Sequence, residues 1–288
     1  LGLPLPGTTV KLVPYDHRER KSRASVHIVR LDFKGRGSIT MNKFMKLAGV
    51  AALASAAFAG AANAEDREFA WSMTVGGTSD YVFRGLSLHN EDPAAQGSVD
   101  VSYGIFYAGA WASNVGTSGD IFYSPMELDL YAGIKPVWGQ FTFDFGIIGY
   151  TYPFADDPGN YVELKAGVST EIVKNLTGGI TTYYTPDQNN YPETWTIEGN
   201  LAYVLPQVHI FTPTISGGLG YANDFDNAGA YSLYTDNYVY WNAGLSLAVE
   251  KLKFDFRYWD TNLDQIPGDF YTGLSDSRFV FSVSATLP

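Results

Sequence analysis

The sequence predicts an all-β fold: a closed antiparallel transmembrane β-barrel of about 12 strands with periplasmic termini. Apolar and polar residues alternate along a dozen segments, the connections between these segments are short and long in turn, and a secretory signal precedes them. Alternation with a period of two is typical of a strand with one apolar and one polar face. Because every backbone polar group in lipid must be paired, a sheet that crosses a membrane has to close into a barrel.

Residues 1–40 are expected to be a disordered upstream extension that is not native to the folded protein. They contain eight Lys and Arg residues against three acidic ones and show little apolar periodicity. A signal peptide normally starts at the initiator Met, and Met41 opens such a signal. We therefore interpret the extension as the result of a start site placed too early, with a genuine basic extension as the alternative.

Residues 41–64 have the three parts of a secretory signal peptide. Lys43 and Lys46 are basic, residues 47–58 are apolar, and Ala62-Asn63-Ala64 supplies the small residues that signal peptidase requires. We expect cleavage after the last of these alanines. The alternative is a single-span anchor, which would need about 20 apolar residues and polar flanks in place of a cleavage site.

The composition excludes several classes of protein. Charged residues make up 17% and aromatic residues 15% of the chain, which is unlike a disordered chain or a coiled coil. The absence of Cys excludes disulfide scaffolds, thiolate metal sites and Cys nucleophiles. The region after the signal has nine basic and 27 acidic residues, and such a charge repels phosphate backbones. No nucleic-acid partner is therefore expected.

Residues 65–288 are expected to form the barrel from twelve alternating segments. In the fourth, Leu128 and Leu130 alternate with Glu127 and Asp129, and in the fifth every second residue of 141–145 is Phe. The third and seventh are the least regular, because Gly and other small residues blur the alternation. In chain order, the expected strands span residues 69–87, 95–103, 105–114, 126–134, 138–152, 160–170, 176–185, 193–204, 209–222, 237–249, 251–261 and 277–287.

The other regular segments repeat this pattern. The sixth alternates Val, Leu and Ala with Glu, Lys and Gly over residues 162–168, and the tenth places Val, Trp, Ala and Leu at every second position over 239–247. The eleventh alternates Leu, Phe and Tyr with Lys, Asp and Arg over 252–258, and the last alternates apolar with mostly hydroxyl residues over 279–286. Each of these segments therefore has one dry and one wet face.

The connections alternate in length. Short links occur at residues 103–104, 135–137, 172–175, 205–208 and 250, and the long loops between them hold ten of the acidic residues. Short turns on one rim, long loops on the other and both termini on the short side are the arrangement of an outer-membrane barrel, whose short turns face the periplasm. Aromatic residues near strand ends suit the girdles of such a barrel; the residues meant are Trp71, Trp138, Tyr150, Tyr152, Trp195, Tyr203, Trp241 and Trp259.

The face opposite the apolar one carries charges on many strands, and these are the candidate pore-lining residues. They are Arg84, Asp100, Glu127, Asp129, Asp144, Glu163, Lys165, Glu198, Lys253, Asp255, Arg257 and Arg278. A small dry barrel could not bury so many charges, whereas a secreted sandwich would place them in solvent, so the soluble fold stays as the alternative. In a water-filled lumen, seven acids against five bases predict a mild cation preference. Pairing of these charges into a plug is the other interpretation.

The segment Val75–Asp100, followed by residues 106–115, resembles the TorF-like porin family of proteobacteria. The most specific part is Ser79-Asp80-Tyr81-Val82-Phe83-Arg84-Gly85 with Gln96-Gly97. The resemblance implies an outer-membrane, channel-like barrel and no catalytic residues. Within this motif, Asp80 and Arg84 either form a constriction or substrate contact or lock the end of the first strand to a neighbour.

The predicted function is a passive diffusion channel for small hydrophilic solutes in the outer membrane of a Gram-negative bacterium. The alternative is a non-conducting structural or surface-interaction barrel that acts through its acidic extracellular loops. The expected partners are outer-membrane lipid and lipopolysaccharide, the barrel-assembly machinery and small solutes. Many outer-membrane barrels end in Phe, which that machinery reads, whereas this chain ends in Leu287-Pro288; assembly is expected, with an altered signal.

No enzymatic activity and no cofactor are expected. The region after the signal has two histidines, His89 in a long loop and His209 at a short turn, so the predicted topology places them on opposite rims. No serine of this region lies in a nucleophile motif such as G-x-S-x-G. Loop carboxylates such as Asp156-Asp157 and Asp224 with Asp226 could bind Ca²⁺ or Mg²⁺ and bridge to lipopolysaccharide phosphate. No metal-spaced His pair or Gly-rich phosphate motif is present.

Overall fold

The computed structural model describes residues 68–116, 124–155, 159–188, 191, 193–224, 237–263 and 274–288. The expectations for the extension and the signal peptide lie outside these residues. Within them the regular structure is all strand. They include no helix that could cross a membrane.

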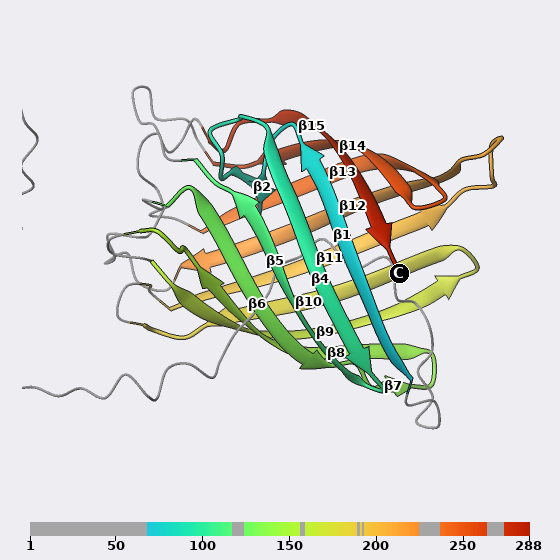
Figure 1. Cartoon of the computed structure of the whole chain (residues 1–288), viewed down its shortest axis with the longest axis horizontal. Coiled ribbons are helices and arrows are strands. Elements are labelled where there is room, and N and C mark those ends of the chain that lie inside the picture. Colours follow the sequence, from blue (N-terminus) through green and yellow to red (C-terminus); the bar gives the residue numbers. More distant parts are fainter. Residues whose placement is uncertain are drawn as a thin grey trace, which may run out of the picture. The chain divides into compact units, whose positions relative to one another are not determined.

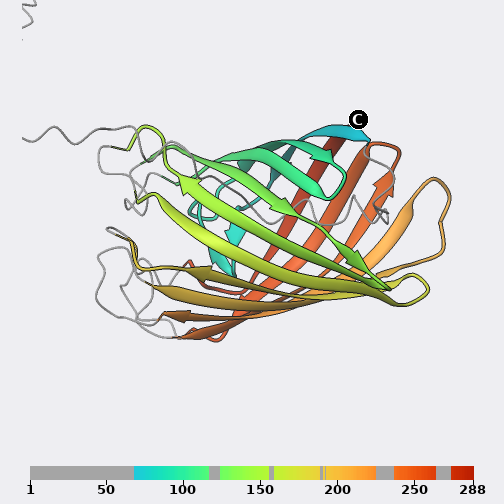
Figure 2. The same ribbon diagram turned by 90° about the horizontal axis from the view of Figure 1, so that it is seen from below.

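Twelve long strands of the described residues form one antiparallel sheet that closes on itself (Figures 1 and 2). Each long strand pairs with the next one in the chain, and β1 pairs with both β4 and β15, which closes the ring. The long strands are β1 (Phe69–Thr78), β4 (Ala94–Tyr103), β5 (Phe106–Asn114), β6 (Met126–Ile134), β8 (Phe141–Thr151), β9 (Tyr161–Val173), β10 (Leu176–Thr185), β11 (Thr194–Val204), β12 (Thr212–Asp224), β13 (Tyr238–Val249), β14 (Leu252–Thr261) and β15 (Arg278–Leu287). The predicted closed antiparallel barrel is thereby confirmed.

Three short strands accompany the barrel. β7 (Val137–Trp138) pairs with the start of β8 at a short turn, whereas β2 (Val82–Phe83) and β3 (Leu86–Ser87) form a separate hairpin. The predicted first strand, 69–87, is therefore wrong beyond Thr78. The backbone at Arg84 and Gly85 has positive φ values of 50° and 84°, which turn the chain back on itself.

Two other predicted strands differ at their ends. The predicted strand 138–152 is interrupted after β7, because Gly139 takes a positive φ of 59° and makes a tight turn. The predicted strand 209–222 starts later, at Thr212, since His209 lies in the turn with a φ of 54°. The remaining predicted strands agree with the observed ones to within three residues at each end.

The alternation of residue types determines which side chains face outward. On β6, Leu130 is exposed and Glu127, Asp129 and Tyr131 are buried. Large apolar side chains are exposed on the outside of many strands, up to 83% for Phe279. Apolar residues outside and charged residues inside are the reverse of a soluble protein and suit a barrel surrounded by lipid.

Glycines on three strands make room for tyrosines that lie against the inner wall. Gly109 pairs across the sheet with Tyr131, and Gly220 pairs in the same way with Tyr240. A Cβ at either glycine would overlap the ring of its partner. Gly133 likewise faces a Tyr ring, that of Tyr107. These tyrosines can therefore lie flat on the neighbouring strand.

Candidate functional site

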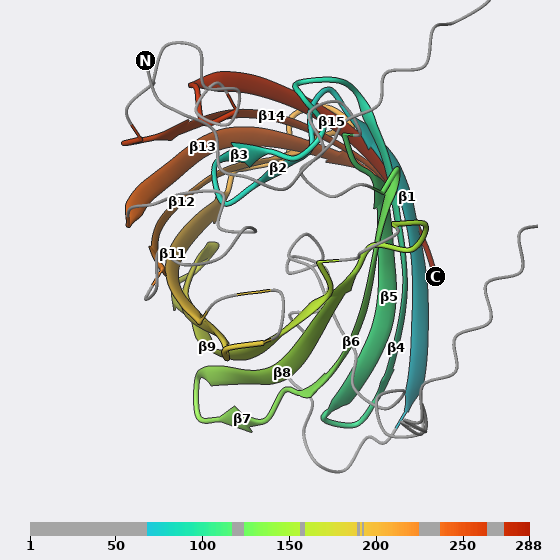
Figure 3. The same cartoon turned by 90° about the vertical axis from the view of Figure 1, so that its left-hand side faces the viewer.

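The connection between β1 and β4, residues 79–93, folds into the barrel and is called the inner loop below. Figure 3 shows its hairpin, β2 and β3, inside the ring of long strands. Leu86 packs with Tyr238 and Tyr240 of β13, whereas the ring of Phe83 meets the ring of Tyr150 on β8 at 5.9 Å. Because β13 and β8 are separated by four strands in the sheet, the inner loop reaches well across the lumen.

Arg84 anchors the tip of the inner loop to β9. Its guanidinium donates two hydrogen bonds to the carboxylate of Glu163, each 2.9 Å long, and the two side chains are 9% and 1% exposed. Tyr150 and Thr185 also donate to this carboxylate. Burial lowers the pKa of Arg84, but the charge and hydrogen bonds of Glu163 together with Tyr150 and Tyr240 outweigh burial, so the pKa lies above its ordinary value and the guanidinium stays charged.

A second buried ion pair anchors the base of the inner loop. Arg278, at the start of β15, donates a 2.9 Å hydrogen bond to Asp80, and Ser87 donates to the same carboxylate at 2.7 Å. Asp80 therefore joins the end of the first strand to its neighbour β15, as one of the two sequence-based interpretations expected, whereas Arg84 ties the inner loop to β9. Arg84 lies on the inner loop and not on the barrel wall.

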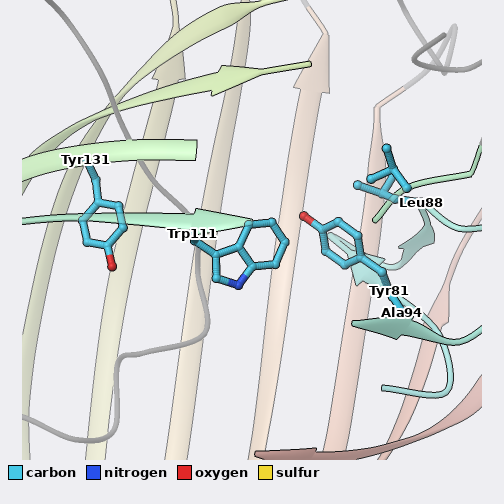
Figure 4. Packing of buried hydrophobic residues seen from close by; sticks show 6 residues of the cluster. Tyr81, Leu88, Ala94, Trp111 and Tyr131 are labelled. Atoms are coloured by element: carbon cyan, nitrogen blue, oxygen red, sulfur yellow. The ribbon is translucent and has the colours of Figure 1, made fainter. Parts of the chain in front are cut away.

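The inner loop also covers two acidic residues of β6. The hydroxyl of Tyr81 donates to Glu127 at 3.4 Å, and its ring packs at 5.2 Å from the ring of Trp111 (Figure 4). Burial and the charges of Glu127 and Asp129 raise the pKa of Tyr81 well above its ordinary value, so the phenol keeps its proton. The second oxygen of Glu127 and both oxygens of Asp129 are buried without a hydrogen-bond partner.

Nearer the short-turn rim, the charged groups are partly accessible. Asp144 accepts hydrogen bonds from Lys165 at 2.6 Å and from Tyr107 at 2.7 Å, and the side chains of Asp144 and Lys165 are 19% and 21% exposed. Arg257 contacts Asp255 at 3.0 Å, with 18% and 17% exposed. Arg257 also donates to Asn242 and Ser216. These groups therefore have accessible surface on the inner side of the barrel.

The remaining predicted lumen residues have separate surroundings. Glu198 accepts a 2.6 Å hydrogen bond from Tyr240, and Asp100 accepts one of 2.9 Å from Ser98. Lys253 is exposed at the short-turn end of β14. The twelve predicted residues thus form several groups. Arg84 and Glu163 hold the inner loop together with Arg278, whose partner Asp80 was not among the twelve. Glu127 and Asp129 lie beneath that loop, and the others are polar groups on the wall.

Sequence reasoning missed the aromatic residues of the lumen. Tyr150 and Tyr152, expected in a girdle, are 2% and 3% exposed, and Tyr150 contacts Glu163. Trp71 and Trp138 are 52% and 78% exposed, as the girdle expectation requires. Tyr150 and Asp144 are an even number of positions apart in β8, so their side chains lie on the same face of the strand. Since Asp144 was predicted to face the lumen, this spacing could have placed Tyr150 there as well.

The two histidines and the loop carboxylates complete the predicted groups. His89 lies in the inner loop, 2.6 Å from the amide of Asn114, and His209 lies in the turn before β12. Among the described residues no three His, Cys, Asp or Glu side chains gather into a metal site. Asp156, Asp157 and Asp226 lie outside the described residues, as does the side chain of Asp224.

A family model described as "Bacterial protein of unknown function (Gcw_chp)" matches residues 61–287. Among solved structures, the KdgM porin is similar at 10% identity and a TM-score of 0.51, covering 75% of this chain and 99% of that chain. A KdgM porin in complex with disordered oligogalacturonate is similar at 10% identity and a TM-score of 0.50, with the same coverage. No curated protein sequence gives a significant match. The likeness to KdgM shows a porin-like barrel fold.

Proposed function

Since the chain belongs to the Gcw_chp family of bacterial proteins of unknown function and has a porin-like fold, we propose that it is an outer-membrane channel. Small hydrophilic solutes would diffuse through it passively, past a constriction made by the inner loop. The signal peptide features of residues 41–64, the apolar outer surface and the unequal loop lengths support the outer-membrane location. The TorF-like resemblance of residues 79–85 supports the same reading.

One observation carries the channel proposal: charged side chains inside the closed barrel keep part of their surface accessible. Lys165 and Asp144 are about one fifth exposed, and Arg257 and Asp255 slightly less. These side chains lie on the inner face of a closed sheet, so the exposed surface is available to water in the lumen. Fixed charges along a water-filled path bias which solutes pass.

We further propose a mild cation preference. Lys165 and Arg257 have acidic partners within 3.0 Å, so their charges are largely compensated. Asp100 and Glu198 accept hydrogen bonds from neutral hydroxyl groups, and neither forms a salt bridge within the described residues. An excess of fixed negative charge raises the local concentration of cations.

The first experiment is single-channel recording in a planar bilayer under a salt gradient. The protein is purified in detergent, and its folded state is verified by the shift in gel migration on heating. We expect stepwise conductance and a reversal potential displaced toward the equilibrium potential of the cation. Folded protein that gives no current would overturn the channel proposal.

The second candidate function is a non-conducting barrel with a structural or surface-interaction role. The observation that favours it is the inner loop itself, which is held across the lumen by two buried ion pairs. The same recording separates the two functions, because a barrel closed by the inner loop should stay silent until that loop is released. A variant that lacks the Arg84 anchor is the matched comparison.

A further inference from the structure

The wall of the lumen contains a pair of buried acids that differs from the other buried acids of the barrel. Glu127 and Asp129 project from the same face of β6 and are 1% and 0% exposed. Asp80 and Glu163, which are buried nearby, each have an arginine partner at 2.9 Å. Within the described part of the chain, no Lys or Arg side chain pairs with Glu127 or Asp129.

Three of the four carboxylate oxygens of this pair accept no hydrogen bond from any other described residue. Both oxygens of Asp129 and the second oxygen of Glu127 are buried without a partner, and the hydroxyl of Tyr81 reaches the first oxygen of Glu127 at 3.4 Å. The two carboxyl groups lie within hydrogen-bond reach of each other, and that bond forms only when one of them carries a proton. Two buried carboxylates that both stay ionised are strongly unfavourable, so the pair is neutralised either by a shared proton or by a bound cation.

We propose that Glu127 and Asp129 bind a hard divalent cation, Ca²⁺ or Mg²⁺, beneath the inner loop. The donors that converge here are oxygens alone, and the charge of the cation matches that of two carboxylates. Mg²⁺ in proteins is often held by one or two carboxylates with water in the other positions, and Ca²⁺ uses the same ligand class. The phenol of Tyr81 adds a further oxygen at the edge of the site.

The position of the site explains what the cation would do. Glu127 is the second residue of β6, at the end of the strand that follows a long loop, so the site lies near the long-loop rim of the barrel. The phenol of Tyr81 belongs to the inner loop and contacts the pair from within the lumen. A bound cation therefore holds the inner loop near the wall, whether or not the lumen conducts.

The test uses luminescence of Tb³⁺, which binds to hard-oxygen sites and is sensitised by nearby aromatic rings. The rings of Tyr81 and Trp111 lie 5.2 Å apart beside the site. In the folded protein, stripped of divalent ions and lipopolysaccharide, we expect saturable Tb³⁺ emission on tryptophan excitation. Titration with Ca²⁺ and with Mg²⁺ should abolish the emission, and the ion that does so at the lower concentration is the one the site prefers.

The double variant Glu127→Gln with Asp129→Asn should lose the saturable emission. The matched control is Glu198→Gln, which removes a lumen carboxylate elsewhere on the wall and should leave the emission unchanged. Absence of saturable emission in the wild type, or equal emission in the double variant, overturns the proposal.

A second measurement keeps the test decisive if the double variant does not fold. The unfolding temperature of the wild-type barrel is compared in Ca²⁺, in Mg²⁺ and in chelator. A cation that binds the folded state alone raises this temperature as its concentration increases. If the unfolding temperature does not change with either ion but rises as the pH is lowered, a shared proton neutralises the pair, and the proposal is overturned.

Discussion

Replacing Arg84 by methionine tests the role of the inner loop. The substitution removes a guanidinium that makes two 2.9 Å hydrogen bonds to Glu163, with both side chains almost completely buried. Breaking one side of a buried ion pair costs about 3–5 kcal/mol, mostly because the remaining charge is left uncompensated. Tyr150 and Thr185 still donate to Glu163, so we expect a loss of about 3 kcal/mol, at the lower end of that range.

The matched control is Arg257→Met, at a pair that is more accessible. Asp255 and Arg257 are 17% and 18% exposed, and water can replace part of the lost interaction. We expect the control to cost about 1 kcal/mol. Adding Glu163→Gln to Arg84→Met should restore part of the lost stability, because the uncompensated charge then disappears.

The measurements are the midpoint of urea unfolding, followed by tryptophan fluorescence, and the single-channel conductance. Release of the inner loop should also increase the conductance of Arg84→Met, and Arg257→Met should not cause that increase. The reasoning is refuted if the two single variants lose equal stability, or if the double variant is less stable than Arg84→Met alone.

Three further predictions concern the wall. Leu219→Arg places a charge on the lipid face near the middle of β12, where Leu219 is 60% exposed. The free energy of unfolding in lipid should fall by about 2–4 kcal/mol. The control Asn200→Arg, on the lumen face, should leave the unfolding midpoint nearly unchanged. Gly109→Ala should destabilise by about 1–3 kcal/mol, because its Cβ would overlap a tyrosine ring, whereas Gly199→Ala meets no atom within 4 Å and should be neutral by the same unfolding assay. Asp144→Asn leaves the charge of its lysine partner uncompensated, so the reversal potential should shift toward the equilibrium potential of the anion. An unchanged reversal potential would exclude Asp144 from the conducting path.

Most of the barrel could be predicted because its pattern is local. The strand predicted over 176–185 coincides with β10, and the one predicted over 126–134 coincides with β6, since a period of two follows from the pleat of each strand. The inner loop could not be predicted in this way. Residues 79–87 continue the sequence pattern of β1, and what bends them inward is contact with residues such as Glu163 and Arg278, which are distant in the chain.

The candidate site shows the same division. The alternation predicted that Glu127, Asp129 and Glu163 share the inner face, and they do. It carried no information about partners, because Arg84 and Glu163 are 79 positions apart and belong to different elements. Their contact depends on how far the inner loop reaches into the barrel, which is a property of the closed ring and not of either segment.

The anchor between Asp80 and Arg278 links the order of synthesis to the final structure. Asp80 follows β1, the first of the described strands to be synthesised, and Arg278 opens the last of them, 198 positions later. The first strand has no partner on one side until β15 arrives. The contact between Asp80 and Arg278 can therefore form only when the ring has closed, and a barrel joined in the wrong register would leave Asp80 without its arginine. A contact inside the lumen thus reports that the seam between the two ends of the chain has formed correctly.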